Sequence, residues 1–286
     1  AGCIIVGFAI KAGVVPLHTW VPEVYTNAPS AISGLFSGVV SKSMLLVLPG
    51  IVLVLDISPR QAGILLIILS FGNMIVGAIK MLTQYNLKSF LAYAAISHTG
   101  YLIFILGVSY FAQQQTALVA VLFAFLTTAF TMCAGYLSLG IYGHYYRIFE
   151  KENLYHVSHL SPFISVCFAI TLAGLAGIPM LAGFVGKWLI YSTAISVGGP
   201  LVLIGFILFL TTSVIALIGY LTMIIRQYYP PRVIRTAQPV KDQEFPLPVW
   251  LQVPIGVLTF LIVLMGIIPA PMLNIIESIV NRMPSL

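Results

Sequence analysis

Eight long apolar runs constrain the fold of this chain more than any other feature of its sequence. A transmembrane helix needs about 20 mostly apolar residues, whereas a transmembrane strand needs about ten residues of alternating polarity. The runs are too long and too uniformly apolar for strands, so the sequence predicts an all-α, polytopic bundle of transmembrane helices. The predicted spans are residues 1–17, 31–55, 62–82, 90–111, 116–142, 163–192, 200–225 and 249–276.

The composition excludes most other classes of protein. Of the 286 residues, 60% are hydrophobic and 7% are charged, whereas soluble chains carry about 25% charged residues. A soluble enzyme, a nucleic-acid-binding protein and a disordered tail are therefore excluded, and residues 1–286 are predicted to form a single membrane domain. Cys3, Cys133 and Cys167 lie far apart in apolar stretches. This favours packing roles, so we expect no metal site and no bound cofactor.

Lysine and arginine are distributed unevenly between the two sides of the predicted bundle. Loops that follow odd-numbered spans hold eight of them, if Lys80 at a span end is included, and the other loops and the C-terminal tail hold two. Cytoplasmic loops carry the excess of basic residues in membrane proteins. The segments 18–30 and 226–248 are therefore predicted to lie in the cytoplasm, and the C-terminus is predicted to lie outside.

Three lysines lie well inside the predicted spans: Lys11, Lys42 and Lys187. A lysine at the centre of a bilayer costs about 2.5–3.5 kcal/mol on insertion scales, so such residues generally face the bundle interior and mark ion or proton paths. The alternative is that the long side chain reaches the membrane interface. This fits Lys80 but fits Lys42 poorly, because apolar sequence flanks Lys42 on both sides. We therefore predict that the three lysines form a proton relay.

The buried lysines have no acidic partner at a similar depth in this sequence. Either they are mostly neutral, because burial disfavours the charged form of an amine, or their carboxylate partners precede this chain. The second alternative agrees with the first residues, which begin inside an apolar run without an initiator methionine or the basic segment of a signal peptide. We therefore expect the chain to be part of a longer protein.

Proline and glycine interrupt two of the spans that carry a buried lysine. Pro16 follows Lys11 in the first span, and Gly177 and Pro179 precede Lys187 in the sixth. Such residues free backbone carbonyls, which a membrane tolerates only where protein or water satisfies them. We predict two broken helices and, from their spacing, inverted five-helix repeats. The predicted units are the end of a first repeat at 1–55, a second repeat at 62–225 and a final helix at 249–276.

Four ordered motifs resemble the antiporter-like membrane subunits of respiratory complex I and their relatives, the Mrp cation/proton antiporters and energy-converting membrane hydrogenases. The resemblance extends from residue 1 to about residue 225, and it is strongest for the N-type subunit of complex I. The motifs are Lys11-Ala-Gly-Val-Val-Pro16-Leu-His18-Thr-Trp20-Val-Pro22-Glu-Val-Tyr25, Ser41-Lys42, Gln84-Tyr-Asn-Leu-Lys88-Ser-Phe-Leu91-Ala92-Tyr93-Ala-Ala-Ile96-Ser97-His98-Thr-Gly100-Tyr101, and Ala176-Gly177-Ile178-Pro179-Met-Leu-Ala182-Gly183-Phe184-Val-Gly186-Lys187.

The resemblance implies a fourteen-helix protein, of which this chain supplies helices seven to fourteen, with helices seven and twelve broken. It places Lys11, Lys42 and Lys187 at the positions of the family's relay residues. The implied function is proton translocation by a non-redox subunit, without a catalytic site of its own, in a complex I-like quinone oxidoreductase. The alternative is a subunit of an Mrp-type Na⁺/H⁺ antiporter or of a membrane-bound hydrogenase.

The resemblance also implies partners and a location. The partners are other membrane subunits of the same complex, lipids and protons, with Na⁺ as the alternative ion, and nucleic acid is not among them. The implied location is an energy-transducing membrane, namely a bacterial or archaeal plasma membrane.

His98 has two interpretations. A histidine near the start of an apolar span is more often a hydrogen-bonded packing residue. The resemblance, however, places a polar central axis close to this position. We therefore treat His98 as a secondary candidate for the proton relay.

Overall fold

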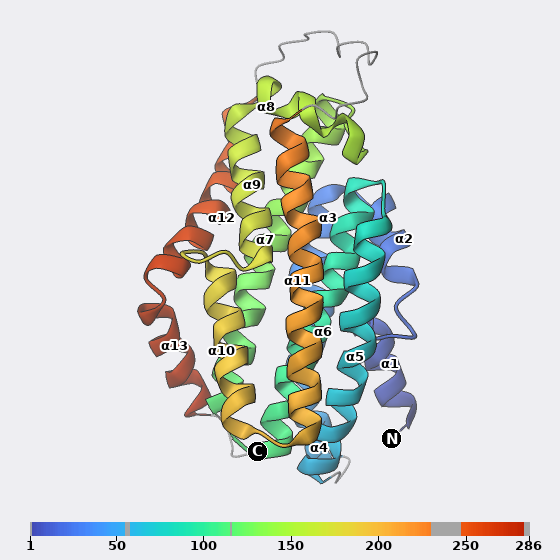
Figure 1. The fold of residues 1–286 in the computed structure, drawn as a ribbon, viewed down its shortest axis with the longest axis vertical. Helices are drawn as coiled ribbons and strands as arrows, with labels where there is room; N and C mark the ends of the chain where they lie inside the picture. Colours follow the sequence, from blue (N-terminus) through green and yellow to red (C-terminus); the bar gives the residue numbers. More distant parts are fainter. Residues whose placement is uncertain (1, 55–57, 115, 230–246, 283–286) are drawn as a thin grey trace.

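The computed structural model describes residues 2–54, 58–114, 116–229 and 247–282. Apart from one isolated bridge between Asn86 and Glu150, the regular elements of these residues are helices, which form an elongated bundle (Figure 1). This confirms the predicted all-α, polytopic bundle. The elements are α1 (Gly2–Ala12), α2 (Trp20–Asn27), α3 (Ser30–Leu35), a π-helical segment (Phe36–Val40), α4 (Ser41–Val54), α5 (Pro59–Thr83), α6 (Leu87–Ala112), α7 (Thr116–Tyr145), a 3₁₀ segment (Lys151–His156), α8 (Val157–Leu160), α9 (Pro162–Ala176), α10 (Ala182–Val197), α11 (Pro200–Tyr228), α12 (Val249–Ile267) and α13 (Ala270–Val280).

Among the described residues, six helical stretches are long and apolar enough to cross a membrane. They match the second, third, fourth, fifth, seventh and eighth predicted spans. In the first predicted span, α1 ends at Ala12 and an irregular segment follows, and in the sixth an irregular segment separates α9 from α10, so the prediction of two broken helices is confirmed. The division into inverted repeats stays a prediction, and residues 1 and 55, which limit its first unit, lie outside the described part of the chain.

Two details of the predicted spans are wrong. The predicted continuous helix at 249–276 is interrupted between α12 and α13, because Pro269 has no backbone N–H and disfavours a helical conformation at Ile268 (φ −125°, ψ 75°). The predicted loop at 18–30 contains the helix α2, which packs against α6. Together, α12 and α13 extend along one side of the bundle with a bend between them (Figure 1).

Helix α6 lies at the centre of the bundle. Every residue from 94 to 110 is buried, because α5, α7, α10 and α11 all contact this helix. A helix that is apolar around its whole circumference is stable only when neighbours cover it on all sides. The polar side chains of α6, including His98, therefore lie in the interior of the protein.

Small residues allow α5 and α6 to pack closely. A Cβ atom on Gly63 would lie 2.4 Å from the backbone nitrogen of Phe111, and one on Gly77 would lie 2.4 Å from that of Ser97. Helices in lipid usually associate through such small residues, since these let the backbones approach. Larger side chains at positions 63 and 77 would therefore push α5 away from α6 and change their register.

Basic residues gather at the end of the bundle where α5, α7 and α11 end. The ammonium of Lys151 lies 4.6 Å from the ring centre of Phe90 at this end. Burial of its amine lowers the pKa of Lys151 to about 8, and the neighbouring positive charge of Arg226 adds to this effect. The described basic residues here are Lys80, Lys88, Arg147, Lys151 and Arg226. Arg232, Arg235 and Lys241 of the predicted cytoplasmic segment lie outside the described residues.

Candidate functional site

The second broken helix is interrupted between Ala176, the last residue of α9, and Ala182, the first residue of α10. Gly177 adopts a left-handed conformation (φ 83°, ψ 41°), in which helices commonly end with glycine. Pro179 follows and cannot donate a backbone hydrogen bond. The carbonyl of Ala176 therefore has no continuing helix to supply its usual donor.

Lys187 of α10 supplies that donor. Its side chain is buried, and its Nζ donates to the carbonyl of Ala176 and to the Oγ of Ser213 on α11, both at 2.8 Å. Both partners are neutral dipoles, so they stabilise the ammonium without forming an ion pair. A Cβ atom on Gly177 would lie 2.8 Å from the Cδ of Lys187. Glycine at this position therefore ends α9 and also leaves room for the lysine.

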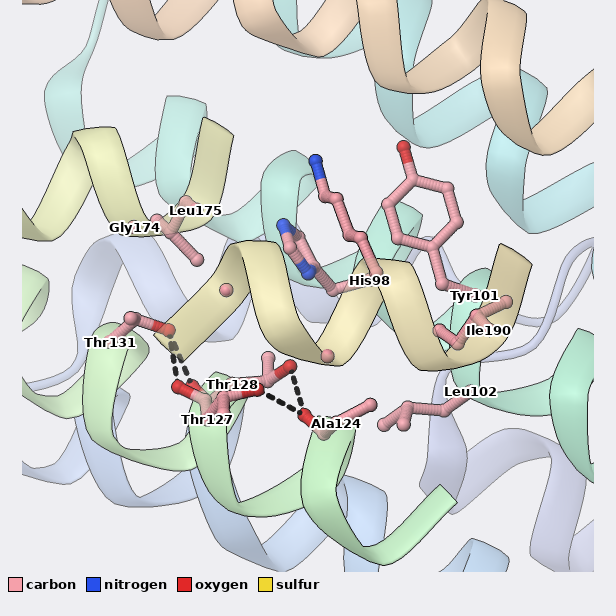
Figure 2. Close-up of a pocket in the computed structure, with 13 residues that line it drawn as sticks. His98, Tyr101, Leu102, Ala124, Thr127, Thr128, Thr131, Gly174, Leu175 and Ile190 are labelled. Atoms are coloured by element: carbon pink, nitrogen blue, oxygen red, sulfur yellow. Dashed lines mark hydrogen bonds between the residues drawn. The ribbon is translucent and has the colours of Figure 1, made fainter. Parts of the chain in front are cut away.

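A small cavity lies beside Lys187, between α6, α7, α9 and α10 (Figure 2). Its volume of about 20 Å³ is enough for one water molecule, which needs about 10–15 Å³. Figure 2 shows His98 and Tyr101 on one side of the cavity and three threonines of α7 on the other. Each threonine hydroxyl donates to a carbonyl of its own helix, so its lone pairs can accept a hydrogen bond from water. The threonines are Thr127, Thr128 and Thr131.

His98 belongs to the same buried group. Its Nε2 lies 3.3 Å from the hydroxyl of Tyr220 on α11, and its ring centre lies 5.2 Å from that of Tyr101. It also lies within electrostatic range of both Lys42 and Lys187. The bond to Tyr220 is typical of a packing histidine, whereas the two lysines favour a relay. The role of His98 in the relay therefore stays a prediction.

Further hydroxyl groups surround Tyr101, which lines the cavity beside Lys187 and His98. The Tyr101 hydroxyl lies among those of Ser97, Thr212 and Ser213. Within the described residues, neither Ser97 Oγ nor the Tyr101 hydroxyl makes a hydrogen bond of normal geometry. A buried hydroxyl without a partner costs about 1–3 kcal/mol. This cost favours ordered water beside these two residues.

Lys42 is held at a different irregularity of the backbone. The helix that contains it changes from α3 to a π-helical segment, Phe36–Val40, and returns to α-helix in α4. The Lys42 side chain is 1% exposed, and its Nζ donates to the carbonyl of Ser37 inside the π-helical segment. Single π-helical turns frequently mark functional sites. Each of the two buried lysines thus takes a backbone carbonyl as its partner.

The first broken helix is held by an amide side chain of α5. Asn73 is fully buried, its Oδ1 accepts from the backbone nitrogen of Val15 at 2.8 Å, and its Nδ2 donates to the carbonyl of Gly13 at 3.1 Å. Pro16 lies in the same irregular segment, after α1 ends. Lys11 lies beside the break but is exposed, apart from the buried group described above. Its place in the relay stays a prediction.

Replacing Asn73 with alanine should destabilise the protein by about 3 kcal/mol. The change leaves a backbone N–H and a carbonyl of the first break buried without partners, at about 1–3 kcal/mol each. The measurement is the free energy of unfolding in detergent. Asn27→Ala is the matched control, because Asn27 is exposed and bonds only to the Glu23 carbonyl of its own helix. Equal free energies for the two variants would show that Asn73 does not hold the break.

Sequence reasoning missed three of these groups. Asn73 and Ser213 carry a signal, since each is a polar residue inside an apolar span. The Ser37 carbonyl has no such signal in the sequence, because every residue has a carbonyl. Only the π-helical geometry directs this one to Lys42. No three His, Cys, Asp or Glu side chains of the described residues lie close enough together to share a metal ion.

Apolar helices long enough to cross a membrane, together with two broken helices, define a multi-pass membrane protein with buried lysines beside its backbone irregularities. Residues 1–218 match the profile of the NADH:quinone oxidoreductase/Mrp antiporter transmembrane family. The chain belongs to this family.

Two relatives show how far the similarity extends. The chain is 29% identical to NADH-quinone oxidoreductase subunit N of Mycobacteroides abscessus over 96% of this chain and 52% of the relative. It is 30% identical to subunit N of Buchnera aphidicola over 96% of this chain and 57% of the relative. The chain therefore spans about half the length of the relatives that it matches.

Solved structures share the same fold. A chain of the Mrp complex from Dietzia sp. is 19% identical and superimposes with a TM-score of 0.84, covering 98% of this chain and 58% of the other. A chain of respiratory complex I from Thermus thermophilus is 25% identical with a TM-score of 0.73, covering 96% and 57%. One of these structures is of an Mrp complex and the other is of a respiratory complex I.

Proposed function

We propose that this chain is part of a proton-translocating subunit, of the N type, in a complex I-like quinone oxidoreductase. The observation that carries the proposal is the environment of the Lys187 side chain. Its amine is buried at a broken helix between one carbonyl and one hydroxyl, and it borders a cavity of the size of a water molecule. An amine in such a place can accept a proton from water and return it without breaking an ion pair.

The proton transfer follows from the donors and acceptors around Lys187. When the amine is neutral, its lone pair accepts a proton from a hydrated neighbour, and the carbonyl of Ala176 and the hydroxyl of Ser213 then stabilise the ammonium. Release of the proton to water in the cavity restores the neutral amine. Lys42 offers a second proton-exchange site of the same kind, with the Ser37 carbonyl as its partner. His98 interacts electrostatically with both lysines and would couple proton exchange at the two sites.

The driving energy would come from other subunits of the complex. In this proposal, electron transfer in other subunits of the complex changes the charge near the lysines and drives their proton exchange. The basic end of the bundle faces the cytoplasm of a bacterial or archaeal cell and the C-terminus lies outside, as the excess of basic residues favours. The similarity to subunit N of quinone oxidoreductases supports this choice of complex.

The second candidate function is cation/proton exchange in an Mrp-type antiporter. The observation in its favour is the fold, which matches a chain of an Mrp complex with a TM-score of 0.84. An antiporter would use the same buried lysines, but the proton gradient would drive Na⁺ movement and no electron transfer would be needed.

Reconstituting the complete assembly into liposomes tests the two candidates. We expect internal acidification on addition of an electron donor and a quinone, at the same rate with Na⁺ or K⁺ as the only cation. The measurement is the fluorescence of a pH-sensitive dye inside the liposomes. An uncoupler that makes the membrane permeable to protons is the control. Proton movement that needs Na⁺ and occurs without electron-transfer subunits would contradict the proposal and support the antiporter.

A further inference from the structure

A second and larger cavity lies at the basic end of the bundle. It is bordered by the beginnings of α3, α6 and α12 and by the end of α7 with the segment that follows it. Its volume is about 540 Å³, within the range of about 300–1,000 Å³ that is usual for small-molecule sites. It shares no lining residue with the cavity beside Lys187. The proton-relay group therefore makes no use of this space.

The polar side chains that line this cavity are hydrogen-bond donors suited to an anion. Lys88 and Arg147 contribute positive charge, and His144 and Ser30 contribute further polar groups. The Nζ of Lys88 donates one hydrogen bond to the carbonyl of Ala28 at 2.8 Å, which fixes the ammonium and leaves two of its N–H groups for a ligand. None of the lining residues is acidic. The charge of this cavity therefore favours a phosphate group.

The remainder of the cavity is apolar and open to the outside of the bundle. Trp250, which is 70% exposed, and Leu251 line it at the start of α12, and Phe149 lines it from the segment after α7. A Cβ atom on Gly143 would lie 2.7 Å from the Phe149 ring, so this glycine allows the ring to pack against α7. Tryptophan is enriched where transmembrane helices meet lipid headgroups. Cationic donors thus adjoin an apolar wall, an arrangement that suits a lipid headgroup and the start of its acyl chains.

We propose that this cavity binds the headgroup of an anionic phospholipid. The phosphate lies between Lys88 and Arg147, and the glycerol and the first part of the acyl chains lie against Trp250 and Phe149. Basic pockets between transmembrane helices bind lipid phosphates in this way. A phospholipid fits better than free phosphate, because most of the cavity wall is apolar and gains nothing from an inorganic ion. The proposal depends on the membrane location of the chain and not on proton translocation.

Photolabelling of the intact protein in lipid nanodiscs tests the proposal. The probe is a phosphatidylglycerol with a photoreactive group beside its phosphate, and the readout is the label on the peptide that contains Trp250. Unlabelled phosphatidylglycerol should remove this label, whereas phosphatidylcholine should not. Arg147→Gln should reduce the label about five-fold, as expected for the loss of one basic residue near a lipid surface. Arg147→Lys should restore most of it.

Arg282→Gln is the matched control, because Arg282 is also exposed but follows α13 at the opposite end of the bundle (Figure 1). The Arg282→Gln variant should be labelled as strongly as the unchanged protein. Arg147→Gln, Arg147→Lys and Arg282→Gln should all keep the unfolding temperature of the unchanged protein. Equal labelling of Arg147→Gln and the unchanged protein would overturn the proposal. So would competition by phosphatidylcholine as strong as that by phosphatidylglycerol, which would indicate lipid contact without headgroup recognition. Removal of the label by inorganic phosphate would overturn the choice of a phospholipid over a free anion.

Discussion

Replacing Lys187 with methionine should lower the rate of proton translocation by about a hundred-fold or more, because a positioned acid–base group contributes about 10²–10⁴-fold to proton transfer. Methionine retains the apolar stem that packs beside Gly177 and Tyr101 but cannot hold a proton. The change should therefore remove the exchange without collapsing the broken helix. The measurement is the initial rate of proton uptake into liposomes that hold the complete assembly, compared at equal rates of quinone reduction.

Two further variants separate proton exchange from a general loss of charge. Lys187→Arg keeps a positive charge that cannot be released, so it should be as inactive as the methionine variant. Lys80→Met removes an exposed lysine at the end of α5 and should translocate protons like the unchanged protein. An unchanged rate of proton uptake in Lys187→Met would exclude the lysine from the relay.

Replacing Gly183 with alanine should destabilise the protein by about 3 kcal/mol or more. The added Cβ atom would lie 1.8 Å from the carbonyl oxygen of Gly174, so α9 and α10 would have to separate beside the break. Overpacking of a well-packed interior usually costs about 1–3 kcal/mol, and here the obstacle is a helix backbone that cannot rotate away. The measurement is the free energy of unfolding in detergent, together with the yield of folded protein in the membrane.

Gly256→Ala is the matched control for that prediction. Its Cβ atom would meet only the far edge of the Phe163 ring, at 3.1 Å, and this ring is half exposed and can turn aside. The variant should therefore fold normally. If Gly183→Ala were as stable as Gly256→Ala, the close approach of α9 and α10 would not be a feature of the folded protein.

The class of fold followed from the sequence because the length and polarity of each apolar run depend only on local composition. The long spans that became α5, α6, α7 and α11 were predicted in this way, within a few residues. Proline and glycine also located both broken helices, since their effect on the backbone is local. The interruption at Pro269 was not predicted, although it has the same cause. The apolar residues on both sides of Pro269 favour one continuous span by composition alone, so only the backbone conformation shows the interruption.

The partners of the buried lysines could not be predicted, because they come from distant parts of the chain. Lys187 bonds to Ser213, 26 residues away, and Asn73 bonds to the first break from 58 to 60 residues away. Two lysines of similar sequence context also differ in exposure. Lys42 is buried against the π-helical segment, whereas Lys11 lies on the surface of the described chain. Only the packing of the helices distinguishes them.

The sequence by itself thus determined that the chain is a helical membrane protein, and it marked Lys11, Lys42 and Lys187 as unusual, because the cost of a charge in an apolar run can be judged residue by residue. The tertiary structure decided which carbonyl or hydroxyl each buried amine contacts and where water has room. It also brought Lys88, Arg147 and Trp250 to one cavity. These properties depend on contacts between helices, which the order of residues within any one helix does not specify.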